Sequence, residues 1–138
     1  MNAYLDTSVV LRLLLGQRDS LKNWREYDNR IGSALVEVEC LRTLDRMRVT
    51  GEISEDQTLE YRAALYPFLE TLELVEPTVA ILRRASGPFP TALGTLDAIH
   101  LSTALAWQDE RREALVIATH DKSFGKAALA LGFRTDGF

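Results

Sequence analysis

Residues 114–121 are Ala-Leu-Val-Ile-Ala-Thr-His-Asp, a continuous apolar run that an aspartate follows almost directly. Such a run is typical of a parallel strand that is buried on both faces. Tyr4-Leu5 is a second short apolar strand, and it also ends at an acid, Asp6. Strands that alternate with helices predict an α/β layer fold with a mostly parallel sheet. Ligands of such sheets bind beyond the carboxyl ends of the strands, where Asp6 and Asp121 are expected to lie.

The remaining segments predict the other elements of this fold. Helices are expected over about 9–15, 18–29, 34–48, 53–70, 78–85, 95–105 and 122–131, and further short strands at 31–33, 72–75 and 133–135. Thr7-Ser8 is expected to cap the first helix, and Ser54 with Gln57 forms a capping box for the helix over 53–70. In that helix the inward-facing side chains are predicted to be Leu59, Ala63, Tyr66 and Leu69.

The composition is that of an ordinary globular protein, with 138 residues, 46% hydrophobic and 26% charged. This length fits one domain, residues 1–138, with a core of its own. The single cysteine, Cys40, excludes an internal disulfide and a cysteine-built zinc site. A net charge of −4 argues against a module that binds nucleic acid through a basic surface.

The sequence contains no segment that resembles a secretory signal or a membrane span. Its longest apolar block, Val9 to Leu15, is interrupted by Arg12, whereas a membrane span needs about 20 apolar residues. We therefore expect a cytoplasmic protein with no membrane association, in agreement with a single thiol.

Four acids are candidates for one site: Asp6, Asp97, Asp121 and a glutamate that is either Glu37 or Glu39. Carboxylates from separate elements suit Mg²⁺ or Mn²⁺, which prefer oxygen ligands. Each aspartate also stands near a helix start, where capping alone would explain it. Helical periodicity does not choose between the two glutamates.

His100 lies one turn after Asp97 on the same helical face. It could donate a proton or orient Asp97, although a buried structural role is the more common use of such a histidine. The chain lacks His/Cys spacing for zinc, a glycine-rich phosphate loop and a Gly-x-Ser-x-Gly elbow.

Four blocks of this sequence, taken in order, resemble the PIN-domain family and in particular its VapC-type toxins. The blocks are Tyr4-Leu5-Asp6-Thr7-Ser8, then residues 33–39 (SALVEVE) with Leu41-Arg42, then residues 95–101 (TLDAIHL) with Thr103-Ala104, and finally residues 116–121 (VIATHD) with Ala127-Ala128 and Gly132. In this alignment the family's glutamate corresponds to Glu39.

The resemblance implies a three-layer α/β/α sandwich with a five-strand parallel sheet and Mg²⁺- or Mn²⁺-dependent ribonuclease activity. The implied catalytic acids are Asp6, Glu39, Asp97 and Asp121, of which the three aspartates hold the metal. Ser8 and Thr119 are implied accessory contacts. The implied partners are RNA, commonly tRNA or rRNA, a small antitoxin protein, and a second copy of the chain in a homodimer.

Two alternatives to a ribonuclease remain at this point. An enzyme that transfers phosphoryl groups through an aspartyl phosphate on Asp6 would also need Mg²⁺, but the usual acid two residues later is replaced by Ser8. A non-catalytic interaction module would use the acids only as helix caps. The four candidate acids equal the whole excess of acidic over basic residues, so the net charge does not by itself exclude RNA as a ligand.

Overall fold

The chain folds around one sheet of five strands that are all parallel, in the spatial order β3-β2-β1-β4-β5. The computed structural model describes residues 1–138. Its elements are β1 (Asn2–Leu5), α1 (Thr7–Leu14), a 3-10 helix (Trp24–Glu26), β2 (Asn29–Ser33), α2 (Leu35–Val49), α3 (Glu55–Leu69), β3 (Glu73–Val75), α4 (Val79–Ala85), α5 (Thr95–Arg111), β4 (Leu115–Ala118), α6 (Lys122–Ala130) and β5 (Arg134–Asp136).

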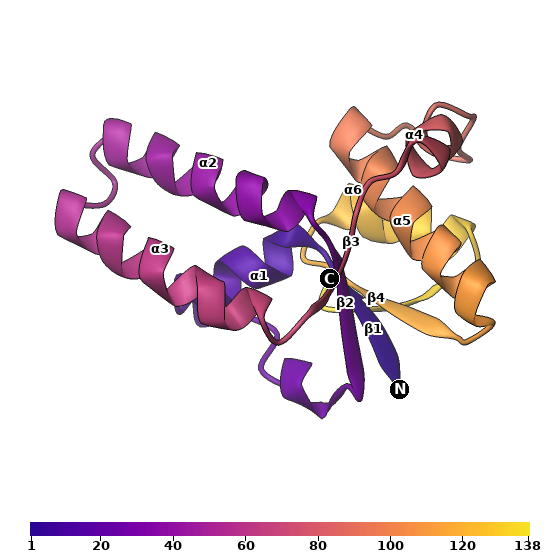
Figure 1. Cartoon of the computed structure of the whole chain (residues 1–138), viewed down its shortest axis with the longest axis horizontal. Coiled ribbons are helices and arrows are strands. Elements are labelled where there is room, and N and C mark those ends of the chain that lie inside the picture. The colour runs from indigo at the N-terminus through magenta and orange to yellow at the C-terminus, as the bar shows by residue number, and fades with distance from the viewer.

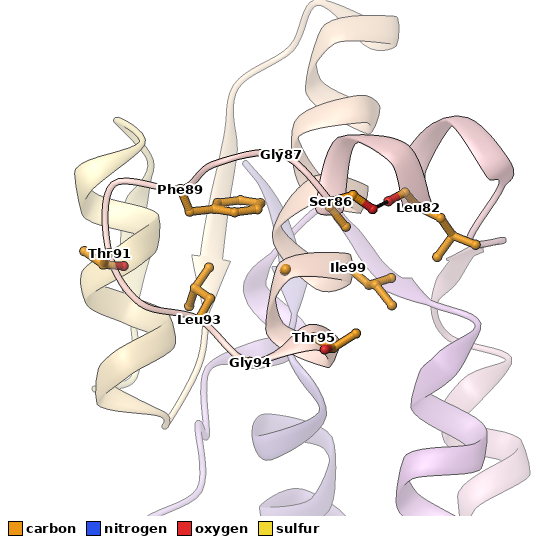
Figure 2. A pocket seen from close by; sticks show the side chains of 11 residues that line it. Leu82, Ser86, Gly87, Phe89, Thr91, Leu93, Gly94, Thr95 and Ile99 are labelled. Atoms are coloured by element: carbon orange, nitrogen blue, oxygen red, sulfur yellow. Dashed lines mark hydrogen bonds between the residues drawn. The ribbon is translucent and has the colours of Figure 1, made fainter.

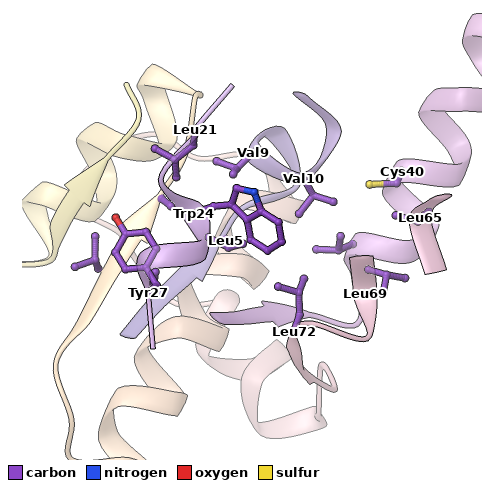
Figure 3. Close-up of a cluster of buried hydrophobic side chains, with 14 residues drawn as sticks. Leu5, Val9, Val10, Leu21, Trp24, Tyr27, Cys40, Leu65, Leu69 and Leu72 are labelled. Carbon is purple, nitrogen blue, oxygen red and sulfur yellow. The ribbon is translucent and has the colours of Figure 1, made fainter. Parts of the chain in front are cut away.

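Helices cover both faces of the sheet, as Figure 1 shows, which confirms the expected α/β/α sandwich. The central strand β1 divides its side chains between two cores, because successive residues of a strand point to opposite faces. Ala3 and Leu5 pack with α1, α2 and α3, and Figure 3 shows part of this core. Tyr4 packs on the other face with α5 and α6. The predicted strand of residues 114–119 is β4, and all four of its residues are buried.

The segment 18–29 differs from its prediction, because it forms turns and one 3-10 helix instead of an α-helix. Its three apolar side chains, Leu21, Trp24 and Tyr27, are all buried in the core that contains Ala3 and Leu5. Side chains three residues apart line up in a 3-10 turn as well as along an α-helix. The apolar spacing therefore did not distinguish the two structures.

Two details at the helices also differ from their predictions. Asp6, one residue earlier than expected, is the N-cap of α1. In α3 the buried side chains are Thr58, Leu65 and Leu69, whereas Leu59 is 66% exposed and Tyr66 is 45% exposed. Leu59 and Tyr66 were expected to face inward, together with Ala63, which is also exposed. Leu69 is buried as predicted, and the buried face continues from it to Leu65 and Thr58, which lie four and eleven residues earlier on the same side of the helix.

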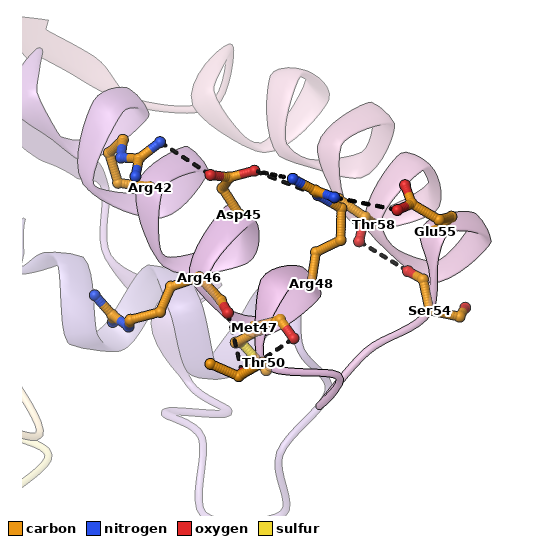
Figure 4. Close-up of polar contacts among 9 residues, drawn as sticks. All are labelled: Arg42, Asp45, Arg46, Met47, Arg48, Thr50, Ser54, Glu55 and Thr58. Carbon is orange, nitrogen blue, oxygen red and sulfur yellow. Dashed lines mark hydrogen bonds and ion pairs between the residues drawn. The ribbon is translucent and has the colours of Figure 1, made fainter.

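Helices α2 and α3 form an antiparallel hairpin that extends from the body of the molecule. Its far end is held by Arg48, which pairs with Asp45 of its own helix and with Glu55 of α3, as Figure 4 shows. The predicted capping box is present, with Ser54 and Gln57 each accepting a hydrogen bond from the other's backbone N–H. None of the chain's helices combines the length and the apolar character needed to span a lipid bilayer.

Candidate functional site

The carboxyl ends of β1 and β4 form the centre of the candidate site. These two neighbouring strands mark the point where the chain changes direction across the sheet, which is where α/β sheets bind ligands. Asp6 follows β1 and is only 5% exposed. Its Oδ2 accepts hydrogen bonds from Ser8 Oγ at 2.8 Å and Thr119 Oγ1 at 2.9 Å, and its Oδ1 accepts one from the Thr7 N–H at 2.8 Å. The carboxylate of Asp6 is therefore fixed in one orientation.

Asp121 lies two residues after Thr119 and is joined to the same network. Its backbone N–H donates to Thr119 Oγ1 at 3.0 Å. Its side chain caps α6, since Oδ1 accepts from the Phe124 N–H at 3.1 Å. The capping explanation thus holds for both Asp6 and Asp121, and it leaves Oδ2 of Asp121 without a hydrogen bond.

Asp97 behaves differently from these two caps. It stands in the first turn of α5 and is partly buried, but its carboxylate forms no hydrogen bond and no ion pair. Burial, followed by the negative charges of Asp6 and Asp121, raises the pKa of Asp97 from 3.8 to about 6. Capping does not explain this residue, and its environment disfavours the ionised form.

Of the two candidate glutamates, Glu39 is the one that lies near the aspartates. Its Oε1 accepts hydrogen bonds from His100 Nε2 at 2.6 Å and from Thr7 Oγ1 at 3.1 Å. Its charge also contributes to the raised pKa of Asp97. Glu37 instead lines a shallow pocket with Arg62 of α3, away from these residues. The packing of α2 thus decides which of the two glutamates lies near the aspartates, which helical periodicity could not.

His100 is almost completely buried, at 1% exposure. Its Nδ1 lies 2.6 Å from the hydroxyl of Tyr4, and its Nε2 contacts Glu39, not Asp97. Burial acts to lower the pKa of His100, but the hydrogen bond to Glu39 and the charge of Asp6 outweigh it, so that this pKa is raised. Sequence reasoning did not single out Tyr4, although strand alternation places its side chain on the same face of β1 as Asp6.

The donor set suits a hard divalent cation in its chemistry. All four side chains offer carboxylate oxygens, and no lysine or arginine pairs with any of them. As the side chains stand, no three His, Cys, Asp or Glu groups converge tightly enough to hold a metal ion. The carboxylate of Asp97 makes no hydrogen bond and no ion pair, so a change of its rotamer toward the others would break neither.

Two cavities lie close to the acids. One of about 440 Å³ lies between α4, the loop 86–94 and the start of α5, with Phe89 and Leu93 on its wall, as Figure 2 shows. None of the four acids lines it. The other, also about 440 Å³, is a groove between α1 and α2 that is lined by Ser8, Arg12 and Arg46. This groove connects a residue that contacts Asp6 with two cationic side chains.

Comparison with known families and curated proteins gives a consistent result. The model of the PIN domain family matches residues 3–129. Ribonuclease VapC47 of Mycobacterium tuberculosis (strain CDC 1551 / Oshkosh) is 27% identical over 134 residues, covering 96% of this chain and 93% of the relative. Ribonuclease VapC46 of Mycobacterium tuberculosis (strain ATCC 25618 / H37Rv) is 32% identical over 132 residues, covering 94% of this chain and 92% of the relative.

Solved structures with the same fold include two from toxin–antitoxin systems. A toxin–antitoxin complex from Klebsiella pneumoniae matches with a TM-score of 0.60 and 16% identity, over 87% of this chain and 88% of that one. VapBC2 from Rickettsia felis, bound to a DNA fragment from its promoter, matches with a TM-score of 0.66 and 16% identity, over 99% of this chain and 98% of that one. At this level of identity the likeness concerns the fold.

Proposed function

The chain belongs to the PIN-domain family, and from that premise we propose that it is a Mg²⁺- or Mn²⁺-dependent endoribonuclease, the toxin of a toxin–antitoxin pair. One observation carries the metal dependence. The carboxylate of Asp97 has no hydrogen bond, lies among the charges of Asp6 and Asp121, and is paired with no lysine or arginine; the charge of His100 offsets this repulsion only in part, since the pKa of Asp97 is still raised to about 6. A divalent cation would relieve this repulsion. The names of the two curated relatives support the ribonuclease activity.

In this proposal Asp6, Asp97 and Asp121 would hold the metal. The bound metal would lower the pKa of a water molecule and offset the charge that builds on the phosphate. Ser8 and Thr119 would keep the Asp6 carboxylate in the orientation described above. The Asp6 carboxylate is therefore oriented before RNA binds and does not need to reorganise during the reaction.

Glu39 would orient the attacking water. Its Oε1 is occupied by two donors, whereas its Oε2 forms no hydrogen bond and can accept one from water. The water oxygen attacks phosphorus and gives up one proton to solvent, the bond from phosphorus to the 3′-oxygen breaks, and that oxygen takes a proton from solvent. The products are a 5′-phosphate and a 3′-hydroxyl. Unpaired regions of tRNA or rRNA suit this site best as substrates, because their nucleotides can be splayed out of a helix. With such substrates, we expect the proposed activity to take place in the cytoplasm.

The proposal includes two protein partners, a small antitoxin and a second copy of the chain. Large apolar side chains that are exposed on the chain could be covered by such partners. They include Leu59 and Tyr66 on α3, Val79 and Leu82 on α4, and Leu96 on α5. Light scattering of the purified chain, alone and with the product of an adjacent small reading frame, tests both partners.

Cleavage of tRNA and rRNA by the purified chain tests the activity. We expect cleavage with Mg²⁺ or Mn²⁺, none with EDTA, and a loss of at least about 100-fold in Asp6→Asn, as for removal of one electrostatic contact in an active site. Asp56→Asn is the matched control, because Asp56 is an exposed acid in the first turn of α3. Activity that survives both EDTA and Asp6→Asn would refute the proposal.

The same samples separate the two alternatives. Covalent labelling of Asp6 by a phosphate analogue would instead indicate phosphoryl transfer through an aspartyl phosphate. A melting temperature that does not change with Mg²⁺ or Mn²⁺, together with no cleavage, would indicate a non-catalytic module, because a ligand that binds the native state stabilises it.

A further inference from the structure

A buried chain of hydrogen bonds connects the central strand to the carboxylate of Glu39. It runs from the Tyr4 hydroxyl on β1 to His100 Nδ1 on α5 at 2.6 Å, and from His100 Nε2 to Glu39 Oε1 on α2 at 2.6 Å. Tyr4 is 0% exposed and His100 is 1% exposed. The chain thus joins three elements through side chains that are shielded from solvent, where a hydrogen bond is stronger than in water.

The direction of these hydrogen bonds follows from the chemistry of their end points. An ionised carboxylate oxygen accepts only, so His100 Nε2 carries the hydrogen that it shares with Glu39. In the neutral ring Nδ1 is then an acceptor, and the Tyr4 hydroxyl donates to it. In the protonated ring, which the raised pKa of His100 favours, Nδ1 donates to the Tyr4 oxygen instead. The Tyr4 hydroxyl thus holds Nδ1 in either protonation state, while Nε2 donates to Glu39.

The two oxygens of Glu39 have different environments as a result. Oε1 accepts from His100 at 2.6 Å and from Thr7 Oγ1 at 3.1 Å, whereas Oε2 accepts no hydrogen bond. A glutamate side chain on a partly exposed helix face would otherwise sample several rotamers. Here one oxygen is fixed and the other is left for the site.

We propose that His100 is a positioning residue, which holds Glu39 through Oε1 so that Oε2 stays free to accept from the attacking water, and that Tyr4 supports it by holding the imidazole ring at Nδ1. This inference rests on the proposed ribonuclease function. His100 itself touches neither RNA nor metal in this scheme. Partners that orient an active-site or metal-binding carboxylate typically contribute about 10- to 100-fold to activity or metal affinity.

A double-mutant cycle on the full chain tests the inference. His100→Ala and Glu39→Gln are made singly and together, and kcat, KM and Mn²⁺ affinity by calorimetry without RNA are measured. We expect kcat of each single variant to fall about 10- to 100-fold, with KM within about 3-fold of the wild type. The double variant should lose no more in kcat than the larger of the two single losses, because the effects of residues that act as one unit do not add. Mn²⁺ affinity should change little in each of the three variants, because neither His100 nor Glu39 holds the metal in this scheme.

Further variants separate positioning from folding. His100→Gln keeps an N–H that can reach Glu39 and should recover part of the activity lost in His100→Ala, while Tyr4→Phe should lose less than His100→Ala. Ser102→Ala is the matched control, because Ser102 is buried on the same helix and its hydroxyl has no hydrogen-bond partner. Its activity should equal that of the wild type.

The outcomes distinguish this inference from the proposed function. A wild-type chain that cleaves RNA and binds Mn²⁺, but whose His100→Ala and Glu39→Gln losses multiply in the double variant, overturns the positioning role alone. Equal activities of His100→Gln and His100→Ala, with both variants folded by thermal unfolding, overturn it too. A wild-type chain that neither cleaves RNA nor binds Mn²⁺ overturns the proposed function and the positioning role together.

Discussion

Replacing Asp97 by asparagine should stabilise the protein in EDTA while removing its response to divalent cations. Burial and the charges of Asp6 and Asp121 raise the pKa of Asp97 from 3.8 to about 6. The folded chain therefore binds this proton more tightly than the unfolded chain does. The stabilisation that results is complete below pH 3.8 and is lost as the pH rises through about 6. At neutral and higher pH the ionised Asp97 destabilises the fold.

The size of this effect follows from the difference between the two pKa values. At about 1.36 kcal/mol per pKa unit, a change from 3.8 to about 6 corresponds to about 3 kcal/mol. Asp97 is only half-buried, and solvent screening lowers the figure to about 1–1.5 kcal/mol. An acid in the first turn of a helix gains about 0.5 kcal/mol from the helix dipole, which asparagine gives up. The net expectation is a gain of about 0.5–1 kcal/mol for Asp97→Asn.

Urea unfolding followed by tryptophan fluorescence measures this difference, because Trp24 and Trp107 are both buried. In EDTA at about pH 8 the variant should unfold at higher urea than the wild type, and at about pH 4 the difference should shrink. Adding Mn²⁺ should stabilise the wild type only, because binding to the native state adds to its stability. Asp56→Asn, the first-turn control on α3, should show no gain. Equal or lower stability of Asp97→Asn in EDTA at about pH 8 would refute the argument from charge repulsion.

Three further predictions concern the core, a helix cap and the groove. Leu65→Ala should lower the free energy of unfolding by about 2–5 kcal/mol in urea titrations, because Leu65 is fully buried, and a loss under about 1 kcal/mol would contradict this packing. Ser54→Ala should lower it by about 1 kcal/mol by removing the capping box of α3, and unchanged unfolding would argue against the cap. Arg46→Ala, which alters the groove beside Ser8, should weaken RNA binding in filter assays and reduce the slope of log affinity against log salt by about 0.7. Arg42→Ala is its control, because Arg42 pairs with Asp45 outside that groove, and equal effects of the two variants would contradict a role for the groove.

Much of the fold was predictable from short-range patterns. The apolar run at 114–119, the capping box at Ser54 and the alternation of strands with helices each depend on neighbouring residues, and each is present in the structure. The position of Asp6 and Asp121 at strand ends follows from the same patterns, since parallel strands bring their carboxyl ends to one edge. The segment 18–29 is the exception, because its apolar spacing fits a 3-10 turn as well as an α-helix.

The candidate site needed more than these patterns. The sequence by itself determined an α/β chain with acids after two strands and in the first turn of α5. Only the tertiary structure decided that Glu39 and not Glu37 joins the aspartates, that His100 contacts this glutamate, and that Asp97 has no partner of its own. The physical reason is that the rotation of α2 about its axis is set by Val36 and Cys40 packing against the sheet and α1. Helical periodicity fixes which residues share a face, and packing between distant segments fixes what that face meets.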